Sequence, residues 1–382
     1  MRIAADVNIP FVKECFRSIG EVMVMPGRAI SAERIAESDC LLVRSVSVVD
    51  KDLLEGGRVK FVGTATTGYD HIDSEYLRRR GIGFASAPGS NSNSVAEYVV
   101  AGLLSVGQKH KIKLEGASIG IIGVGNIGSE VERKCKALGM EVVLNDPPLR
   151  RRSGDEKYRP IEEVLDCDFV TLHTPLSYEG PDRTYHLADE RFFESIKDGC
   201  VFINTSRGAV TKSEALKSAI KSGKAKAAVL DVWENEPDID MELLRMVDIS
   251  TPHIAGYSLD GKVNGMLMIY KSACEYFGIE AVKDIEDFLP EPDVPEIRLD
   301  NRDEDEEEII HQAVQQVYPV NRDDFNTREI AVVSEEERGR FFDKLREDYP
   351  VRREFQNTKV ILEANCKNLA RKLEGIGFKV FR

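Results

Sequence analysis

One stretch of the sequence, residues 113–147, limits the possible folds more than any other. An apolar run over 119–124 leads into the glycine motif G-x-G-x-x-G at 123–128, and a helical pattern then continues to Gly139. A second strand-like run ends at Asp146. A strand, a glycine-rich turn, a helix and a second strand ending in an acid together form the dinucleotide-binding fingerprint of doubly wound α/β folds.

Each part of this fingerprint has a physical role in holding a dinucleotide. The first two glycines let the backbone turn tightly and approach a pyrophosphate, and the third lets the helix pack closely on the strand. The helix N-terminus faces the negative charge. Asp146 lies where a carboxylate can accept hydrogen bonds from a ribose hydroxyl. The cofactor-binding residues predicted from the fingerprint are Gly123, Gly125, Asn126, Ile127, Gly128 and Asp146.

The sequence after the fingerprint repeats the order of strand and helix. Strands are expected at 168–174, 200–205, 226–232 and 247–251, with amphipathic helices at 190–195 and 213–222. Near-continuous apolar strands between such helices are typical of a doubly wound parallel sheet. Ligands of these sheets gather at the carboxyl ends of the strands, so the residues that follow each strand are the candidates for a site.

Three of those strand ends carry side chains whose chemistry fits one reaction. Arg207 presents a planar fork of donors that would hold a carboxylate in a bidentate manner. His253 could take the proton of a secondary alcohol while a hydride leaves the same carbon. Glu236 could accept a hydrogen bond from the other imidazole nitrogen. We therefore predict that Arg207, Glu236 and His253 are the catalytic residues, with no metal required.

The regions on either side of the fingerprint domain differ from it. Residues 1–92 read as short alternating strands and helices, and the S-x-x-E spacing of a capping box at 94–97 predicts the start of a long crossover helix. A proline- and acid-rich linker at 288–295 is followed by an acidic run at 303–308, interpreted as a solvated helix start. Residues 287–382 then form a third α/β unit.

Charge and cysteine content exclude several functional classes. The net charge of −14 over 382 residues argues against broad binding of nucleic acid or of an anionic membrane. No apolar run is long enough for a membrane span, and the chain starts without a secretory signal pattern. Seven scattered cysteines with no C-x-x-C pair favour reduced thiols and a cytoplasmic location.

Several motifs in the right order carry a resemblance to a known family. They are L-H-T-P-L at 172–176, N-T-S-R-G at 204–208, D-V-W-E-N-E-P at 231–237 and T-P-H at 251–253, together with the fingerprint. With them the chain resembles the D-isomer-specific 2-hydroxyacid dehydrogenases. That resemblance implies an NAD-binding Rossmann-type domain, residues 93–256, inserted in a discontinuous flavodoxin-like substrate domain formed by 1–92 and 257–286.

The resemblance also implies roles for individual residues. Arg207 would hold the substrate carboxylate, His253 would be the acid and base, and Glu236 would be its partner. The residues that it adds to the cofactor-binding set are Thr174, Ser206, Asp231 and Gly256. Asp146 opposes binding of a 2′-phosphate, so NAD rather than NADP is expected, and the arginines at 150–152 are interpreted as a solvated turn.

A narrower resemblance is to one branch of this family, whose members act on a small phosphorylated hydroxy acid. It is carried by V-R-S-V-S at 43–47, G-T-A-T-T-G-Y-D-H-I-D at 63–73, E-G-P at 179–181 and H-I-A-G-Y-S-L-D-G-K at 253–262. The substrate-binding residues that it implies are Arg44, Ser45, Thr66 and Tyr257. This branch ends in a dimerisation domain, so a homodimer through 287–382 is expected.

Some alternatives stay open at this point. As a hypothesis, Arg352 or Arg353 reaches the site of a partner subunit as a phosphate ligand. The chain could instead be another D-2-hydroxyacid dehydrogenase, for example one acting on phosphoglycerate, because such an enzyme would share the catalytic residues. It could also be a dehydrogenase-fold protein that senses NAD and serves in regulation.

Overall fold

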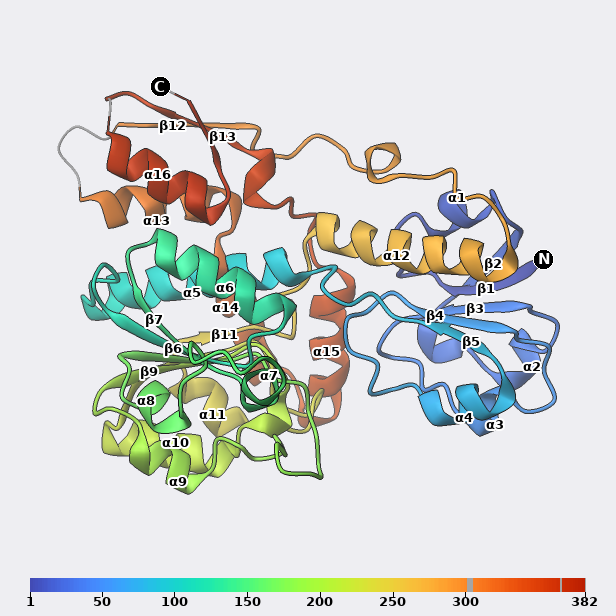
Figure 1. Ribbon diagram of the computed structural model, residues 1–382, viewed down its shortest axis with the longest axis horizontal. Helices are drawn as coiled ribbons and strands as arrows, with labels where there is room; N and C mark the ends of the chain where they lie inside the picture. The colour runs from blue at the N-terminus through green and yellow to red at the C-terminus, as the bar shows by residue number, and fades with distance from the viewer. Residues whose placement is uncertain (301–304, 365, 382) are drawn as a thin grey trace. The chain divides into compact units, whose positions relative to one another are not determined.

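The computed structural model describes residues 1–300, 305–364 and 366–381. The chain divides into two compact units, one of residues 1–91 with 258–290 and one of residues 92–257 with 291–382 (Figure 1). All pairings between strands are parallel, so the predicted α/β class with parallel sheets is confirmed. The three-domain division with boundaries near 92, 256 and 286 stays a prediction, and the C-terminal residues group here with the fingerprint region.

The first unit is built on a five-stranded sheet in the order β2-β1-β3-β4-β5. Its strands are β1 (Arg2–Asp6), β2 (Glu21–Met25), β3 (Cys40–Val43), β4 (Phe61–Thr64) and β5 (Gly83–Ala85). Its helices are α1 (Val12–Phe16), α2 (Ala32–Ile35), α3 (Lys51–Leu54), α4 (Ser74–Arg80) and α12 (Leu259–Phe277). Helix α12 contacts β4 and β5 and buries Val263, Met266 and Ile269 in the same core. Residues after 257 therefore return to the N-terminal sheet.

The second unit contains a six-stranded sheet in the order β11-β10-β9-β8-β6-β7. The strands are β6 (Ser118–Ile122), β7 (Glu141–Asn145), β8 (Phe169–Leu172), β9 (Cys200–Asn204), β10 (Ala225–Leu230) and β11 (Ile249–Ser250). Because β7 lies on one side of β6 and β8 on the other, the strand order reverses at β6. In doubly wound sheets this switch point opens the crevice in which ligands bind.

Helices cover both faces of this sheet (Figure 1). One face is covered by α5 (Ser92–His110) and α6 (Asn126–Ala137), and the other by α8 (Ile161–Leu165), α9 (Glu190–Ser195), α10 (Ser213–Ser222) and α11 (Met241–Met246). A further short helix, α7 (Pro147–Ser153), contains the three arginines at 150–152, which are exposed. The expectation of a turn there is wrong, since Asp146 caps a helix by accepting a hydrogen bond from Leu149 N at 2.8 Å.

The predicted capping box at the start of the crossover helix is also wrong. Helix α5 begins at Ser92, two residues before the expected cap. Ser94 Oγ donates a hydrogen bond to Ala255 O at 2.9 Å, and Glu97 Oε1 accepts one from Phe355 N at 2.8 Å. Both side chains therefore make tertiary contacts, which a local sequence pattern does not distinguish from capping.

The C-terminal region has a parallel sheet of its own, in the order β12-β13-β14. Its strands are β12 (Glu296–Leu299), β13 (Lys359–Leu362) and β14 (Lys379–Phe381), and its helices are α13 (Glu306–Val317), α14 (Val320–Arg328), α15 (Glu335–Glu347) and α16 (Lys367–Ile376). Of the acidic run at 303–308, residues 303 and 304 lie outside the described residues. Glu307 accepts hydrogen bonds from Leu114 N and Glu115 N, so this residue is not simply solvated.

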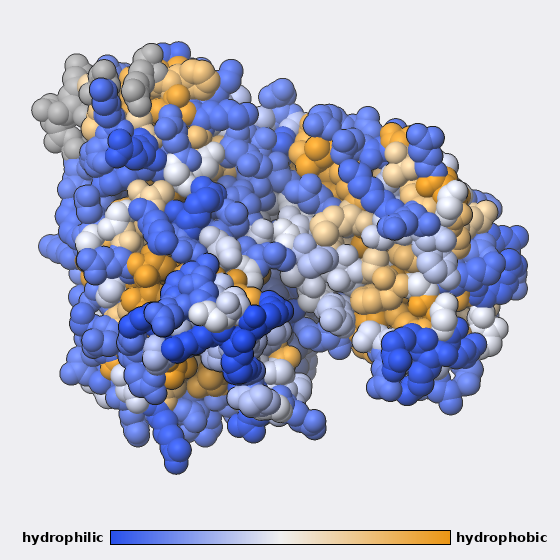
Figure 2. All heavy atoms as spheres, viewed as in Figure 1, coloured by the Kyte–Doolittle hydropathy of each residue, from blue (hydrophilic) through white to orange (hydrophobic). Residues whose placement is uncertain are grey.

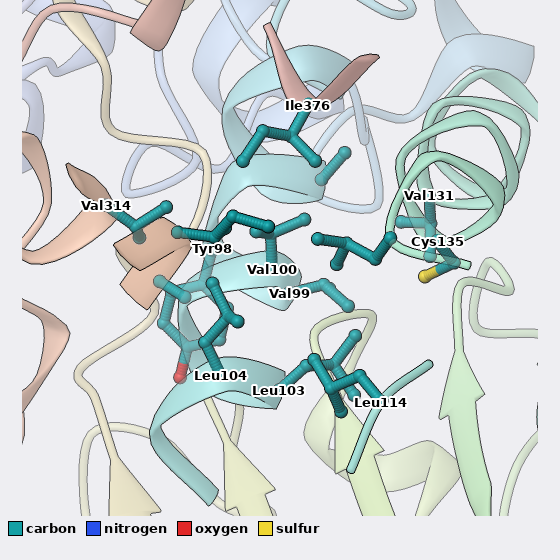
Figure 3. Packing of buried hydrophobic residues seen from close by; sticks show 14 of the residues in the cluster. Tyr98, Val99, Val100, Leu103, Leu104, Leu114, Val131, Cys135, Val314 and Ile376 are labelled. Atoms are coloured by element: carbon teal, nitrogen blue, oxygen red, sulfur yellow. The ribbon is translucent and has the colours of Figure 1, made fainter. Parts of the chain in front are cut away.

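The C-terminal region shares its core with the fingerprint domain. In Figure 3, Val314 and Ile376 lie beside Tyr98, Val100 and Leu104 of α5. Helix α16 also contacts α6, and α13 contacts α5. This continuous apolar core explains why residues 291–382 group with the second unit.

Two arginines of this region were proposed to reach a partner subunit, and the structure contradicts that hypothesis for Arg352. The side chain of Arg352 is 6% exposed, with Nη1 donating to Glu97 Oε2 at 3.1 Å and Nη2 to Ser94 Oγ at 2.7 Å. Arg353 is buried as well, and its Nη2 donates to Asn357 Oδ1 at 2.9 Å. The sequence showed only two adjacent cations and not the buried acid that one of them pairs with.

Among the helices of residues 1–300, 305–364 and 366–381, none is both long enough and apolar enough to cross a bilayer. Hydrophilic residues cover most of the face seen in Figure 2, with apolar residues in separate patches.

Candidate active site

The glycine loop between β6 and α6 has the geometry that the fingerprint predicts. Gly123 has a φ of +89°, and a Cβ there would lie 2.7 Å from His173 O. A Cβ on Gly128 would lie 2.1 Å from Gly123 O, so only glycine lets the helix approach the loop this closely. A Cβ on Gly125 would meet no heavy atom within 4 Å, which leaves open space over this residue. A pyrophosphate could approach the backbone there.

The groups around this loop also suit a dinucleotide. Gly125 is the N-cap of α6, so Asn126 and Ile127 form the first turn at the positive end of a twelve-residue helix. Asp146 Oδ2 accepts a hydrogen bond from Val124 N at 2.9 Å, which ties the second strand to the loop. Among the described residues, Thr174 Oγ1 is buried without a hydrogen-bond partner. A buried hydroxyl of this kind at a strand end is a ready donor for a ligand.

Arg207 lies in the loop that follows β9, and a neighbouring amide orders this loop. Asn204 Oδ1 accepts from Ser206 N and Ser206 Oγ, at 2.9 and 2.8 Å, while its Nδ2 donates to Arg207 O at 3.0 Å. Nη1 of Arg207 donates to Ser206 O at 2.7 Å. The sequence motif did not indicate this role of Asn204, although an amide at a strand end before a turn is a common way to fix a loop.

The catalytic histidine and glutamate of the prediction are in direct contact. His253 Nδ1 lies 2.8 Å from Glu236 Oε2, and Glu236 Oε1 accepts a hydrogen bond from Trp233 N at 2.7 Å. This arrangement places the proton of the neutral imidazole on Nδ1 and leaves the lone pair of Nε2 for a substrate. His253 has a φ of +59°, a left-handed conformation that is unusual for a residue with a side chain.

The environment of Glu236 keeps it ionised. Burial by itself would raise the pKa of this carboxyl group, but the neighbouring His253, the N–H of Trp233 and the positive charge of Arg346 together hold the pKa below its usual value. A carboxylate bonded to Nδ1 orients the imidazole and stabilises its protonated form. The pair can therefore accept a proton from an alcohol.

Asp231 holds the loop that carries His253. The residue is buried, and its Oδ1 accepts from Ile254 N and Thr251 Oγ1, both at 2.7 Å, while Oδ2 accepts from Ala255 N at 3.0 Å. Burial raises the pKa of Asp231 despite these donors. Gly256, the residue after Ala255 in this loop, is half-buried. The contacts of Asp231 indicate a positioning role for this side chain.

Packing brings the Arg207 loop and the His253 loop together. A Cβ on Gly208 would lie 1.9 Å from Trp233 C, so the loop after β9 packs directly on the loop after β10. Trp233 Nε1 in turn donates to Thr251 O at 2.9 Å, just before His253. Trp233 thus links the loops that bear all three predicted catalytic residues, and the sequence gave no signal of this role beyond its place in the motif.

The four predicted substrate-binding residues divide between the two compact units. Tyr257 belongs to the unit with His253, and Arg44, Ser45 and Thr66 belong to the other. Within that other unit, Arg44 Nη1 donates to Asn8 O at 3.3 Å and Ser45 is exposed. Thr66 Oγ1 donates to Gly68 O at 2.8 Å. These three residues follow the carboxyl ends of β3 and β4, the edge at which parallel sheets present ligand-binding groups.

Comparison with known proteins places this chain in a family. Residues 91–255 match the family described as D-isomer specific 2-hydroxyacid dehydrogenase, NAD binding domain, and residues 288–377 match a domain of unknown function, DUF3410. Erythronate-4-phosphate dehydrogenase from Marinobacter nauticus is 43% identical, with all of both chains covered. The enzyme of that name from Proteus mirabilis is 41% identical over 99% of each chain.

Solved structures agree with the fold. D-lactate dehydrogenase from Aquifex aeolicus, solved with NAD and lactic acid, is 25% identical, with a TM-score of 0.61 and coverage of 73% of this chain and 96% of that one. NAD-bound 3-phosphoglycerate dehydrogenase from Entamoeba histolytica is 24% identical, with a TM-score of 0.63 and coverage of 74% and 99%. The chain therefore belongs to the erythronate-4-phosphate dehydrogenases, within the NAD-dependent D-isomer specific 2-hydroxyacid dehydrogenases.

Proposed function

We propose that this chain oxidises 4-phospho-D-erythronate at C2 with NAD, giving 2-oxo-3-hydroxy-4-phosphobutanoate, as a step of pyridoxal 5′-phosphate synthesis. The substrate is supported by relatives of that name at 43% and 41% identity over nearly whole chains. The chemistry is supported above all by one observation, the 2.8 Å contact between His253 Nδ1 and Glu236 Oε2. A histidine held in this way is a suitable general base for an alcohol.

The catalytic residues have distinct tasks in this proposal. His253 takes the C2 hydroxyl proton through Nε2, and Glu236 stabilises the imidazolium that results. Arg207 binds the substrate carboxylate and polarises the oxygen at C2 as it becomes a carbonyl oxygen. NAD, when bound, supplies the acceptor for the hydride that leaves C2. The reverse reaction returns the proton from His253 to the carbonyl oxygen.

The proposed NAD site lies along the carboxyl edge of the six-stranded sheet. The open space over Gly125 and the helix N-terminus behind it would receive the pyrophosphate, and Asp146 would accept hydrogen bonds from the ribose. The buried hydroxyl of Thr174 is a further donor at this edge. The remaining members of the proposed set are Gly123, Asn126, Ile127, Gly128, Ser206, Asp231 and Gly256.

The proposal for the substrate extends to a hydroxyl-rich set of side chains. Ser45 and Thr66 would provide hydroxyl donors for a polyhydroxylated anion, Thr66 by exchanging its bond to Gly68 O, and Arg44 and Tyr257 complete the proposed set. Thr66 lies in a network in which Thr64 Oγ1 is 2.7 Å from Thr66 Oγ1 and 3.0 Å from His71 Nε2. Such a network fixes the orientation of hydroxyl groups and so suits recognition of a particular sugar acid.

The proposal also includes the oligomeric state of the protein and its cellular compartment. The chain would form a homodimer through its C-terminal region, which exposes the large apolar side chains of Phe325 (65% exposed), Val332 (77%) and Val351 (58%). Exposed apolar groups of this size often belong to protein interfaces. The cytoplasm is the proposed compartment, and it is supported by seven free cysteines.

Turnover of defined substrates tests this proposal. Purified protein is assayed with 4-phospho-D-erythronate and with 3-phosphoglycerate, each with NAD and with NADP, and a 2-oxo acid is added to reoxidise bound cofactor. The proposal predicts the highest kcat/KM for 4-phosphoerythronate with NAD. A higher value for 3-phosphoglycerate would favour another dehydrogenase of this family, and NAD binding without turnover of either acid would favour a regulatory protein.

A further inference from the structure

Arg346 of helix α15, in the C-terminal region, lies near Tyr257 in the loop that follows His253, within the same compact unit. The guanidinium carbon of Arg346 is 5.9 Å from the centroid of the Tyr257 ring. A second neighbour of that ring is Tyr349, in an edge-on contact with a centroid distance of 5.9 Å and an interplanar angle of 83°. Tyr257 thus contacts two side chains from a region that lies far from it in the sequence.

The position of Arg346 is unusual for an arginine. Its side chain is only 15% exposed, and its Nε is buried with no hydrogen-bond partner among the described residues. The ionisable groups that face it are Tyr257, Glu236 and Asp343, whose Oδ1 lies 3.7 Å from Nη1. A buried cation is costly unless nearby groups compensate its charge. Two of the three compensating groups belong to the candidate active site.

We propose that Arg346 is a positioning residue of this active site, which fixes the ring of Tyr257 and supplies a positive charge to the environment of Glu236. This inference rests on the proposed function and assigns the C-terminal region a part in it. The region would then serve catalysis directly, in addition to any role in assembly. Arg346 itself does not contact the reacting atoms and acts through Tyr257 and Glu236.

The electrostatic effect of Arg346 has a definite direction. Its charge is among the influences that lower the pKa of Glu236, and the ionised form of Glu236 is the one that holds Nδ1–H of His253. Removal of the positive charge makes protonation of the Glu236–His253 pair easier. The acidic limb of the pH profile for alcohol oxidation then moves to higher pH, because the base is lost at a higher pH than in the wild type.

The experiment compares Arg346→Met, Arg346→Gln and Arg346→Lys in the full-length protein. Arg340→Met is the matched control, because Arg340 is an exposed arginine on the same helix. Steady-state oxidation of 4-phosphoerythronate is measured across pH, together with thermal melting and NAD affinity. The wild-type protein is assayed in parallel, since its failure to turn over this acid would reject the proposed function and not the inference.

The expected result separates charge from volume. Arg346→Met and Arg346→Gln lose about tenfold or more in kcat/KM, the order expected for loss of a desolvated cation–π contact, and their acidic limbs move to higher pH. Arg346→Lys keeps the position of the limb because it keeps the charge, while NAD affinity is unchanged in all. If Arg346→Met melts too early to assay, the comparison of Arg346→Gln with Arg346→Lys still measures the effect of the charge. Equal pH profiles for Gln, Lys and Arg340→Met would overturn the inference.

Discussion

Asp231 Oδ1 accepts a hydrogen bond of 2.7 Å from the backbone N–H of Ile254, the residue that follows His253. The N–H of His253 in turn donates to Asp231 O at 2.7 Å. One residue just after β10 therefore holds the His253 loop by both its main chain and its side chain. The left-handed backbone of His253 can persist because the surrounding contacts fix it.

Asp231→Asn tests this relationship. The amide group of asparagine has one acceptor where the carboxylate has two, so at least one of the buried donors at Ile254, Ala255 and Thr251 loses its partner. We expect a loss of about 1–3 kcal/mol in unfolding free energy and a fall in kcat, since the His253 loop relaxes. Urea unfolding and steady-state kinetics measure both. Wild-type kcat together with wild-type stability would contradict the positioning role.

Glu236→Gln separates the charge of the glutamate from its shape. Glutamine can keep the hydrogen bond from Trp233 N but cannot stabilise a protonated imidazole by charge. We expect kcat/KM for oxidation to fall by about 10- to 100-fold, as for loss of a hydrogen bond to a charged group. The acidic limb of the pH profile should move to lower pH, opposite to the change expected for Arg346→Gln. An unshifted limb would show that the carboxylate has no influence on the base.

The sequence predicted the fingerprint domain in detail because its signals are local. The helices at 190–195 and 213–222 have the predicted bounds, and the strands expected at 168–174, 200–205, 226–232 and 247–251 are found as β8 to β11 with ends within two residues of the prediction. Apolar strands separated by amphipathic helices specify this class of fold without reference to distant residues. The strand ends then follow from the fold, and so does the position of His253.

The sequence could not reveal contacts between distant segments. Glu97 was interpreted as part of a capping box, although its partners Arg352 and Phe355 lie more than 250 residues further on. No sequence pattern indicated a buried position for Arg346, because an arginine on a polar helix is normally solvated. Side chains that act across such distances become visible only when the packing of α5 and α15 is known.

Two glycine substitutions should separate cofactor binding from folding. Gly125→Ala places a methyl group in open space, so we expect unchanged thermal stability and NAD affinity lower by about tenfold or more, because the methyl group obstructs the pyrophosphate. Gly128→Ala places its methyl group against Gly123 O, so it should lose both stability and affinity. Calorimetric titration and thermal melting measure these properties. Unchanged NAD affinity in Gly125→Ala would contradict the proposed pyrophosphate site.

Glu97→Gln should change how stability depends on pH. Burial, reinforced by Glu354, raises the pKa of Glu97 from 4.5 to about 8 despite Lys134 and Arg352. Between these values the folded protein retains a proton that the unfolded chain has released, so Glu97 makes the wild type less stable as pH rises through this window. The variant lacks this contribution, so its stability relative to the wild type should increase from pH 5 to pH 8. Urea unfolding at both pH values measures the difference, and equal pH dependence would contradict it.

The most direct test of the account is the turnover of His253→Gln. With 4-phosphoerythronate and NAD, we predict a loss of about 10²- to 10⁴-fold in kcat, the contribution typical of a general base, with NAD affinity and thermal stability kept. Turnover at the wild-type rate by this folded, NAD-binding variant would contradict the assignment of His253 as the catalytic base.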